Sequence, residues 1–241
     1  MKRVAILGAT GSVGSQTLDV VRRFPGEFSV VGLAAGFNLE LLVQAAQEFH
    51  PLVVSCQRHE DTLIALLPPK CRMVSQEEVA SLSEADIVVA ASVGRAGLVP
   101  IMAAISAGKP VALANKEPLV MAGEIVMTEA MRKGVDILPV DSEPSAIWQC
   151  LRGEDKEVSR VIITASGGPF RKRSPEDLRS VTPEESLAHP TWSMGRKITV
   201  DSATLMNKGF EVIEAHWLFD LPWEKIEVVV HPQSIIHSMV E

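Results

Sequence analysis

Two carboxylates separated by a single residue, Asp141 and Glu143, are the side chains with the clearest chemical potential in this sequence. They follow residues 135–140, a largely apolar run that is typical of a strand. Residues two apart on an extended backbone point to the same side, so the spacing predicts that both carboxylates face one ligand. Ligands of open α/β sheets bind where the strands end. The pattern therefore favours a ligand site directly after this strand.

A third carboxylate comes from a predicted helix over residues 203–218, which carries Asn207, Lys208 and Glu211. On a helix, Asn207 and Glu211 share a face, and Lys208 lies three residues before Glu211. An ordinary solvated Lys–Glu pair would have the same spacing. The functional interpretation is favoured by Asp201-Ser202 just ahead of the helix, because such residues at a helix start form a cap that can hold an anion.

Asp141, Glu143 and Glu211 offer only carboxylate oxygens, and no histidine or cysteine cluster accompanies them. Hard oxygen ligands favour Mg²⁺ or Mn²⁺ over zinc. Polar groups that would suit a phosphate are Ser166, Ser202, Asn207 and Lys208. Ser166 opens a Ser-Gly-Gly turn, and a turn that only connects elements is the alternative for that segment.

Lys116 lies in the segment Asn115-Lys116-Glu117, directly after the predicted strand 110–114. This position belongs to the same carboxyl edge of the sheet, where a lysine can polarise a carbonyl or bind a ligand oxygen; a surface lysine is the alternative. The polar stretch 171–190 has no helical or strand pattern, as expected of a lid or binding loop. His189 and Trp192 are predicted to close over a ligand there.

Glycines at 8, 11 and 14 follow a predicted strand and open a predicted helix. Such glycines permit a tight turn and close approach of the backbone to a pyrophosphate, although they can also serve packing alone. The second predicted strand ends in Ala34-Ala35-Gly36-Phe37-Asn38, with no carboxylate to bind a ribose 2′-hydroxyl or to repel a 2′-phosphate. NADP is therefore favoured over NAD, although no arginine for the phosphate is obvious nearby.

Short apolar runs alternate with helical patterns through the first part of the chain. The predicted strands are 3–7, 29–34, 52–55, 87–91, 110–114 and 135–140, and the predicted helices are 15–24, 39–48, 99–107 and 122–133. This alternation indicates a doubly wound parallel sheet, a Rossmann domain of residues 1–141. An α+β catalytic domain of residues 142–241 is expected next, with strands 158–165, 227–231 and 235–240. We expect the natural polypeptide to continue beyond this last strand.

Composition narrows the class of protein. The formal charge of −7 and the lack of a basic face argue against a nucleic-acid partner. Cys56, Cys71 and Cys150 have neither metal spacing nor a disulfide framework, which indicates a reducing compartment. Apolar runs fall short of the ~20 residues of a membrane helix, and the first strand leaves no room for a signal peptide. We expect a cytoplasmic protein.

Together these segments resemble the family of 1-deoxy-D-xylulose 5-phosphate reductoisomerase, an enzyme of the non-mevalonate isoprenoid pathway. The resemblance covers the whole chain and is carried by residues 8–14, 113–117, 139–143, 166–170, 189–197, 201–211 and 231–234. It implies a homodimer and a C-terminal helical domain that this chain does not reach. Phe37 departs from the family, which often has a polar or basic residue there, so contact with the cofactor through its backbone is expected.

The implied reaction is a retro-aldol/aldol rearrangement of a small phosphorylated ketose to an aldehyde, which NADPH reduces to 2-C-methyl-D-erythritol 4-phosphate. By motif match, the metal ligands and catalytic carboxylates are Asp141, Glu143 and Glu211, and Lys116 joins them in catalysis. The implied NADPH-binding residues are Thr10, Gly11, Ser12, Val13, Gly36, Phe37, Asn38, Asn115, Glu117 and Gly195. The implied substrate-binding residues are Lys116, Ser142, Glu143, Ser166, His189, Ser202, Asn207, Lys208 and Glu211.

Two alternatives stay open. Another NADP-dependent Rossmann dehydrogenase, of the semialdehyde or homoserine type, would share the glycine-rich opening; a semialdehyde dehydrogenase would also need a nucleophilic cysteine, for which none of the three has a convincing setting. A regulatory protein that binds NADP without chemistry would have no use for three carboxylates.

Overall fold

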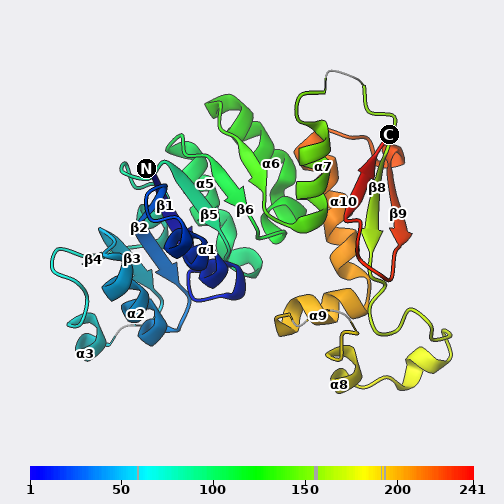
Figure 1. Cartoon of the computed structure of the whole chain (residues 1–241), viewed down its shortest axis with the longest axis horizontal. Helices are drawn as coiled ribbons and strands as arrows, with labels where there is room; N and C mark the ends of the chain where they lie inside the picture. Colours follow the sequence, from blue (N-terminus) through cyan, green and yellow to red (C-terminus); the bar gives the residue numbers. More distant parts are fainter. Residues whose placement is uncertain (59, 155–156, 191, 193) are drawn as a thin grey trace. The chain divides into compact units, whose positions relative to one another are not determined.

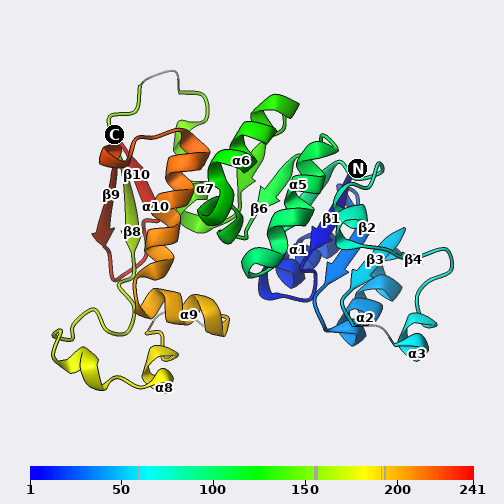
Figure 2. The same cartoon turned by 180° about the vertical axis from the view of Figure 1, so that it is seen from behind.

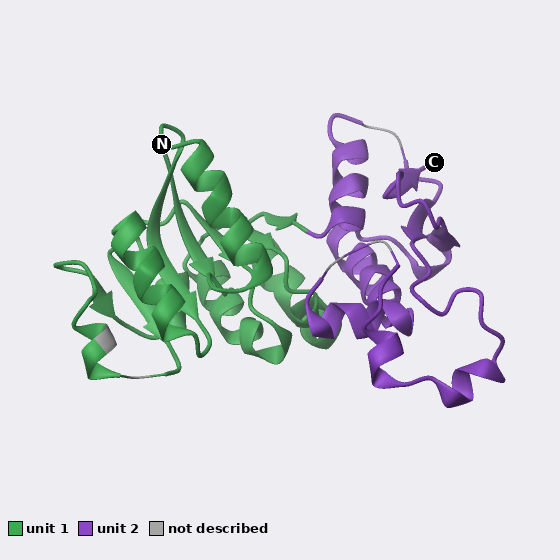
Figure 3. Ribbon diagram, turned by 60° about the horizontal axis from the view of Figure 1, so that its bottom comes forward, with its two compact units in different colours: residues 1–140 green, residues 141–241 purple. Residues whose placement is uncertain are grey.

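The computed structural model describes residues 1–58, 60–154, 157–190, 192 and 194–241. Thr191 and Ser193, which belong to the 189–197 motif, lie outside the described residues. The chain divides into two compact units, Met1–Val140 and Asp141–Glu241, which are coloured separately in Figure 3. Each unit has its own sheet.

A parallel seven-stranded sheet forms the centre of the first unit, in the order β4-β3-β2-β1-β5-β6-β7 (Figure 1). Its strands are β1 (Lys2–Leu7), β2 (Phe28–Ala35), β3 (Val53–Cys56), β4 (Arg72–Met73), β5 (Ile87–Ala90), β6 (Val111–Leu113) and β7 (Ile137–Pro139). Successive strands are added on one side of β1 as far as β4 and on its other side from β5 onward. The topological switch point therefore lies between β1 and β5, where ligands of such sheets bind. The predicted doubly wound fold is confirmed.

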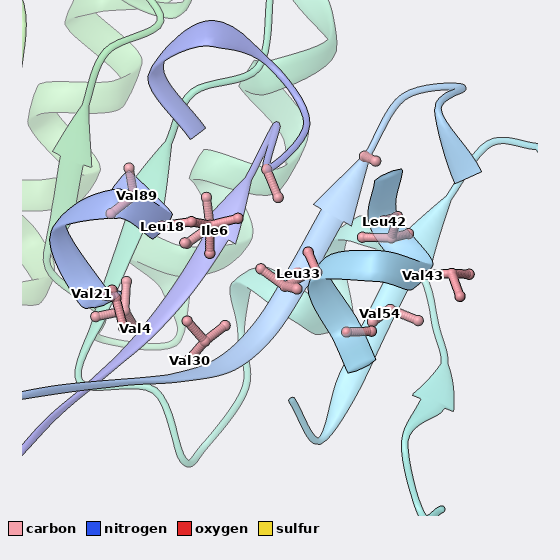
Figure 4. Packing of buried hydrophobic residues seen from close by; sticks show 14 of the residues in the cluster. Val4, Ile6, Leu18, Val21, Val30, Leu33, Leu42, Val43, Val54 and Val89 are labelled. Carbon is pink, nitrogen blue, oxygen red and sulfur yellow. The ribbon is translucent and has the colours of Figure 1, made fainter. Parts of the chain in front are cut away.

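Helices cover both faces of this sheet, as the opposite views of Figures 1 and 2 show. They are α1 (Ser12–Arg23), α2 (Leu39–Phe49), α3 (Asp61–Ile64), α4 (Gln76–Ala80), α5 (Leu98–Ser106) and α6 (Glu117–Lys133). One apolar cluster contains Val4 and Ile6 of β1, Leu18 of α1, Leu33 of β2 and Leu42 of α2 (Figure 4). Both sides of β1 are buried, which is why its sequence is a continuous apolar run.

One helix of this unit begins earlier than predicted. The pattern indicated a helix from residue 122, whereas α6 begins at Glu117 and is kinked at Ala122, whose backbone is not helical (φ −150°). Pro118 is compatible with a first helical turn, because the N–H that proline lacks has no partner within the helix there. Lys116 consequently lies at the N-cap of a helix rather than in an open loop after a strand.

The second unit holds a three-stranded sheet in the order β10-β8-β9. Its strands are β8 (Val161–Ala165), β9 (Ile226–Val230) and β10 (Ser238–Val240); β9 runs parallel to β8, and β10 runs antiparallel to it. The helices are α7 (Ser142–Leu151), α8 (Pro183–Ser186), α9 (Arg196–Ala203) and α10 (Met206–Phe219). Ile147 of α7 and Ala215 of α10 pack on Val161 and Ile163 of β8 to form the core.

The bounds predicted for this unit need correction. The predicted helix 203–218 corresponds to α10 but begins later, at Met206, because Leu205 adopts a left-handed conformation (φ 60°) that separates α10 from α9. Asp201 and Ser202 therefore end α9 and do not cap the helix that carries Glu211. The predicted strand 235–240 is reduced to Ser238–Val240.

Among the described residues, no helix combines the length and the apolar content that crossing a bilayer requires.

Candidate functional site

The carboxylates Asp141 and Glu143 meet at the start of a helix, not on an extended strand as predicted. Asp141 is the N-cap of α7, and Glu143 lies in its first turn. Acidic side chains are favoured at that end because the helix dipole is positive there. Glu211 approaches from α10, and one donor oxygen from each of the three residues lies within 4.8 Å of the others. Two helix segments thus bring together the three residues that the sequence pattern selected.

Glu211 is among the most buried charged side chains in the chain, at 1% exposure. Asn207 Nδ2 donates to its Oε1 (2.6 Å), and Lys208 Nζ donates to its Oε2. Lys208 is itself 7% exposed and lies 3.4 Å from Glu143 Oε1. The alternative of a solvated Lys–Glu pair is therefore wrong. Three clustered carboxylate groups are the kind of oxygen ligands that bind a divalent cation.

A cavity of about 330 Å³ opens beside these groups, and all of its lining residues belong to the second unit. Nine residues singled out from the sequence line it, namely Asp141, Ser142, Glu143, Ser166, His189, Ser202, Asn207, Lys208 and Glu211. Trp192, predicted to close over a ligand, also lines it. A cavity of this size with convergent polar groups is typical of a small-molecule site.

Sequence reasoning missed other lining residues, among them His237, Ser234 and Met194. His237 Nδ1 lies 3.5 Å from Glu143 Oε1, and Ser238 Oγ donates to the Glu143 backbone carbonyl (3.2 Å). No spacing in the sequence signals this approach. It depends on β10 pairing with β8, which returns residues almost a hundred positions away to the start of α7.

Ser166 and His189 form a hydrogen-bonded pair on this cavity. His189 Nε2 lies 3.2 Å from Ser166 Oγ, and His189 Nδ1 accepts the backbone N–H of Trp192 (2.9 Å). A neutral imidazole carries one proton, so Nε2 donates to Ser166 and leaves the hydroxyl proton to point at a ligand. Burial lowers the pKa of His189, and the positive charge of Arg171 lowers it further, so the neutral form is favoured.

The turn after β8 holds Ser166 against the end of α9. Gly168 has φ +65°, and a Cβ there would lie 2.5 Å from the Ser202 carbonyl oxygen. Only glycine satisfies both the left-handed conformation and this close approach. The turn is therefore more than a connection between elements, because it brings Ser166 to the segment that carries Ser202.

In the first unit, the glycines after β1 form a tight cradle. Gly8 has φ +82°, and a Cβ there would lie 2.4 Å from the Ala91 carbonyl oxygen; a Cβ on Gly14 would lie 2.2 Å from that of Gly8. Gly11 is the N-cap of α1 and provides no side-chain cap, so the first N–H groups of the helix are available to an anion. The glycines thus serve packing and leave an anion site open at the same time.

A second cavity of about 340 Å³ adjoins this cradle. It is lined by Gly8, Thr10, Gly11, Ala35, Gly36, Phe37, Asn38, Gln57, Gln76, Ala91, Ser92, Val93 and Ala96. Of the predicted cofactor residues, Ser12, Val13, Asn115, Glu117 and Gly195 are not among these lining residues. Gly195 belongs to the second unit, where it is the N-cap of α9.

Asn115, Lys116 and Glu117 lie at the start of α6, where the first two are buried and Glu117 is half-buried. Asn115 is 2% exposed and donates from Nδ2 to Glu117 Oε2. Lys116 is 7% exposed, so the alternative of a surface lysine is wrong. Burying an amide and an ammonium group costs free energy, which argues for a role beyond solubility.

Comparison with known proteins identifies the family. A sequence model described as 1-deoxy-D-xylulose 5-phosphate reductoisomerase matches residues 4–123, and a model of the C-terminal domain of the same enzyme matches residues 137–219. Curated relatives with this name from Chlorobaculum tepidum and Thermoanaerobacter sp. are 57% and 56% identical over the whole chain. The chain belongs to the 1-deoxy-D-xylulose 5-phosphate reductoisomerase family. It spans 65% of the length of these relatives.

Solved structures of 1-deoxy-D-xylulose 5-phosphate reductoisomerases have the same fold as this chain. A complex with NADPH, fosmidomycin and magnesium superposes on all of this chain and 64% of that one, with a TM-score of 0.93 and 42% identity. The Zymomonas mobilis enzyme in complex with NADPH gives a TM-score of 0.91, at 43% identity and the same coverage. A putative homoserine dehydrogenase from Archaeoglobus fulgidus, at 19% identity and a TM-score of 0.56, shares the fold alone.

Proposed function

We propose that this protein converts 1-deoxy-D-xylulose 5-phosphate into 2-C-methyl-D-erythritol 4-phosphate, with NADPH and Mg²⁺ or Mn²⁺. One observation carries the proposal. The three carboxylates Asp141, Glu143 and Glu211 converge within 4.8 Å in the same cavity that is lined by side chains suited to a phosphate, Ser166, Ser202, Asn207 and Lys208. A phosphorylated ketose needs both features, because its carbonyl end must be activated while its charged end is held.

The carboxylate cluster fits a hard divalent cation. Its donors are all oxygens, and the buried Asn207 Oδ1 beside it has no hydrogen-bond partner among the described residues. Asp141, Glu143 and Glu211 would hold the ion. When bound, the ion supplies Lewis acidity to the neighbouring carbonyl and hydroxyl oxygens of the sugar. Ser142 Oγ donates to Glu143 Oε2 (2.6 Å) and orients that carboxylate.

The opposite end of the substrate would meet hydroxyl, amide and ammonium donors. Ser166, Ser202, Asn207 and Lys208 supply them from three separate segments, and His189 fixes the direction of the Ser166 hydroxyl. Holding the phosphate orients the reacting carbons. The binding energy of this group, which does not itself react, offsets the cost of that orientation. His189 and Trp192 on the long loop would exclude water from the reactive aldehyde.

The glycine cradle of the first unit fits a dinucleotide. The first N–H groups of α1 would bind the pyrophosphate beside Thr10, Gly11, Ser12 and Val13. NADPH supplies the hydride that reduces the aldehyde. Asn115 and Glu117, which hold each other, and Gly195 of the second unit would contact the cofactor. Lys116 would donate a hydrogen bond to a substrate oxygen, since its buried ammonium group carries three N–H donors.

The proposal includes a homodimer that works in the cytoplasm. The family resemblance is what implies the dimer; Val228, Val229 and Val230 of the edge strand β9 are 46%, 37% and 53% exposed in this chain, which spans 65% of its relatives' length. The three cysteines are free thiols, as in proteins of reducing compartments. Sedimentation velocity would report the dimer, and a monomer at all concentrations would contradict it.

Oxidation of NADPH by the natural full-length protein tests the activity. The absorbance of NADPH should fall only when 1-deoxy-D-xylulose 5-phosphate and Mg²⁺ or Mn²⁺ are both present. A dehydrogenase of the homoserine type would instead act on its own substrate, and it would do so even when a chelator has removed the metal ions. A sensor would bind NADPH and oxidise none. Either of these last two results would overturn the proposal.

A further inference from the structure

The dinucleotide cavity lacks a cation from the segment that usually supplies one for a ribose 2′-phosphate. Phe37 is apolar and 73% exposed. Asn38 is occupied as the N-cap of α2, where its Oδ1 accepts the Leu41 N–H (3.1 Å). In Rossmann proteins that use NADP, an arginine near the end of the second strand accommodates the 2′-phosphate. The segment 34–38 contains no such residue.

The end of the neighbouring strand supplies an arginine. β3 runs parallel to β2 with Cys56 opposite Ala35, and the Gln57 N–H donates to the Gly36 carbonyl oxygen (2.8 Å). Cys56 Sγ donates to the same oxygen (3.2 Å). These two bonds attach the end of β3 to the 36–38 loop. Arg58 is the next residue along the chain.

The guanidinium of Arg58 reaches the first turn of α2. Its Nη1 donates to Glu40 Oε1 (2.7 Å), and Glu40 is the second residue of that helix. Gln57, the neighbour of Arg58, lines the dinucleotide cavity together with Phe37 and Asn38. Arg58 is not itself a lining residue, but its guanidinium is held at the first turn of the helix that follows β2, the region in which Rossmann proteins place the groups that contact the ribose 2′ substituent.

From this geometry we infer that Arg58 binds the 2′-phosphate of NADPH and determines the preference for NADPH over NADH. The inference rests on the proposed function, because it assigns a role toward the same cofactor. A guanidinium suits this role, since its fork of N–H donors matches phosphate oxygens and it stays charged at all relevant pH values.

Arg58 already has two partners, Glu40 and Glu60, and both pairs are exposed to solvent. Exposed ion pairs contribute little to stability, so a phosphate can replace one of them at small cost. The carboxylates also repel a phosphate, and they must therefore weaken the affinity that Arg58 provides. Removing Glu60 while keeping Arg58 should strengthen the binding of NADPH and leave that of NADH unchanged.

The test measures binding to the natural full-length protein by calorimetry, with NADPH, NADH, adenosine 2′,5′-bisphosphate and adenosine 5′-monophosphate as probes. Arg58→Met should weaken NADPH and the bisphosphate about tenfold or more, because a charge-assisted bond is lost, and should leave NADH and the monophosphate unchanged. Arg22→Met is the matched control. Arg22 is also exposed and bound to two carboxylates, Asp19 and Glu48, near the end of α1. This control should change no affinity.

Arg95 is the rival residue, because it lines a neighbouring cavity of about 730 Å³ that shares Gln57 with the dinucleotide cavity. A loss of NADPH preference in Arg95→Met but not in Arg58→Met would overturn the inference. An equal loss for all four probes in Arg58→Met would also overturn it, since that indicates a structural role. If Arg58→Met fails to fold, Glu60→Gln decides, and an unchanged ratio of NADPH to NADH affinity counts against Arg58.

Failure of the proposed function is a separate result. Suppose that the wild type turns over 1-deoxy-D-xylulose 5-phosphate with NADPH while Arg58→Met keeps the wild-type preference for NADPH over NADH. That result refutes the role of Arg58 and leaves the proposed function intact. Wild-type protein that binds none of the four probes refutes the dinucleotide site, and with it both proposals.

Discussion

Lys208 and Glu211 form an ion pair in which both side chains are almost fully buried, with 9% and 1% of their side-chain surface exposed. Spacing of i and i+3 on a helix ordinarily gives a solvated pair of small energetic value. Burial of two charges costs desolvation free energy, so a buried pair is not expected where the two side chains could stay in solvent. The pair is best explained as part of a cavity built to receive charged ligands.

Glu211→Gln should lower the affinity for Mn²⁺ by about tenfold or more while the affinity for NADPH stays nearly unchanged, since ligand charge determines cation affinity. Electron paramagnetic resonance of free Mn²⁺ measures the first quantity, and calorimetry with NADPH measures the second. Glu214→Gln is the matched control, because Glu214 lies on the same helix with 1% exposure and does not line the cavity. Equal losses of Mn²⁺ affinity in both variants would show that Glu211 acts on the fold of α10.

Lys208→Met should destabilise the protein in the absence of metal. The substitution removes the cation that lies between Glu211 and Glu143, and breaking a buried pair costs about 3–5 kcal/mol. Mn²⁺ should then raise the melting temperature of the variant more than that of the wild type, because the ion replaces the lost positive charge. Differential scanning fluorimetry with and without Mn²⁺ measures this difference.

A matched control for Lys208 is Lys197, which pairs with Asp201 at 2.8 Å but has 45% of its side chain exposed. Lys197→Met should change the melting temperature little, with the same response to Mn²⁺ as the wild type. Equal stabilisation of Lys208→Met and the wild type by Mn²⁺ would show that the ion does not replace the charge of Lys208, and stabilisation of neither would show that the carboxylate cluster is not a cation site.

His189 should make stability depend on pH. Its folded-state pKa lies below the ordinary value of 6.5, so the folded protein favours the neutral imidazole while the unfolded chain binds a proton more readily. The stability from this residue is fully present above pH 6.5 and is lost as the pH falls below that value toward the folded-state pKa. Thermal melts between pH 8 and 5 should show that the wild type loses more than His189→Gln over this window.

The comparison for His189 is His50→Asn, since His50 is exposed and asparagine tolerates the left-handed conformation found there (φ 49°). This variant should follow the wild-type pH profile. A wild-type profile parallel to that of His189→Gln would show that the neutral imidazole does not contribute to the fold.

The sheet of the first unit was predictable because its strands are buried on both faces. Residues such as Val4, Ala5 and Ile6 are all apolar and buried, and this continuous pattern can be distinguished from the periodicity of the helices between the strands. Once the strands are identified, the residues directly after β1 and β6 can be placed at the carboxyl edge of the sheet without any knowledge of long-range contacts. Lys116 was placed correctly after β6, although its location at a helix start was not seen.

The second unit was less predictable because its site depends on local backbone geometry and long-range pairing. Leu205 interrupts a helical pattern because its φ is positive, and a leucine gives no indication of that conformation in the sequence. The start of α7 was overlooked, although Asp141 followed by Glu143 and a proline is a readable helix-start signal. Arg58 and His237 reach their sites only through strand pairing, so no local motif contains them.

Gly168→Ala should disrupt the phosphate end of the cavity. The new Cβ would lie 2.5 Å from the Ser202 carbonyl oxygen at φ +65°, so the turn that carries Ser166 must move away from α9. We expect a loss of about 1–3 kcal/mol in the free energy of unfolding from strain, and a higher KM for the phosphorylated substrate. Gly153→Ala separates the two causes, because Gly153 has φ +79° but open space around the position of a Cβ. That control should lose stability and keep the wild-type KM, measured from NADPH oxidation. A KM raised equally in both variants would mean that strain alone, rather than contact between the Ser166 turn and Ser202, governs substrate binding.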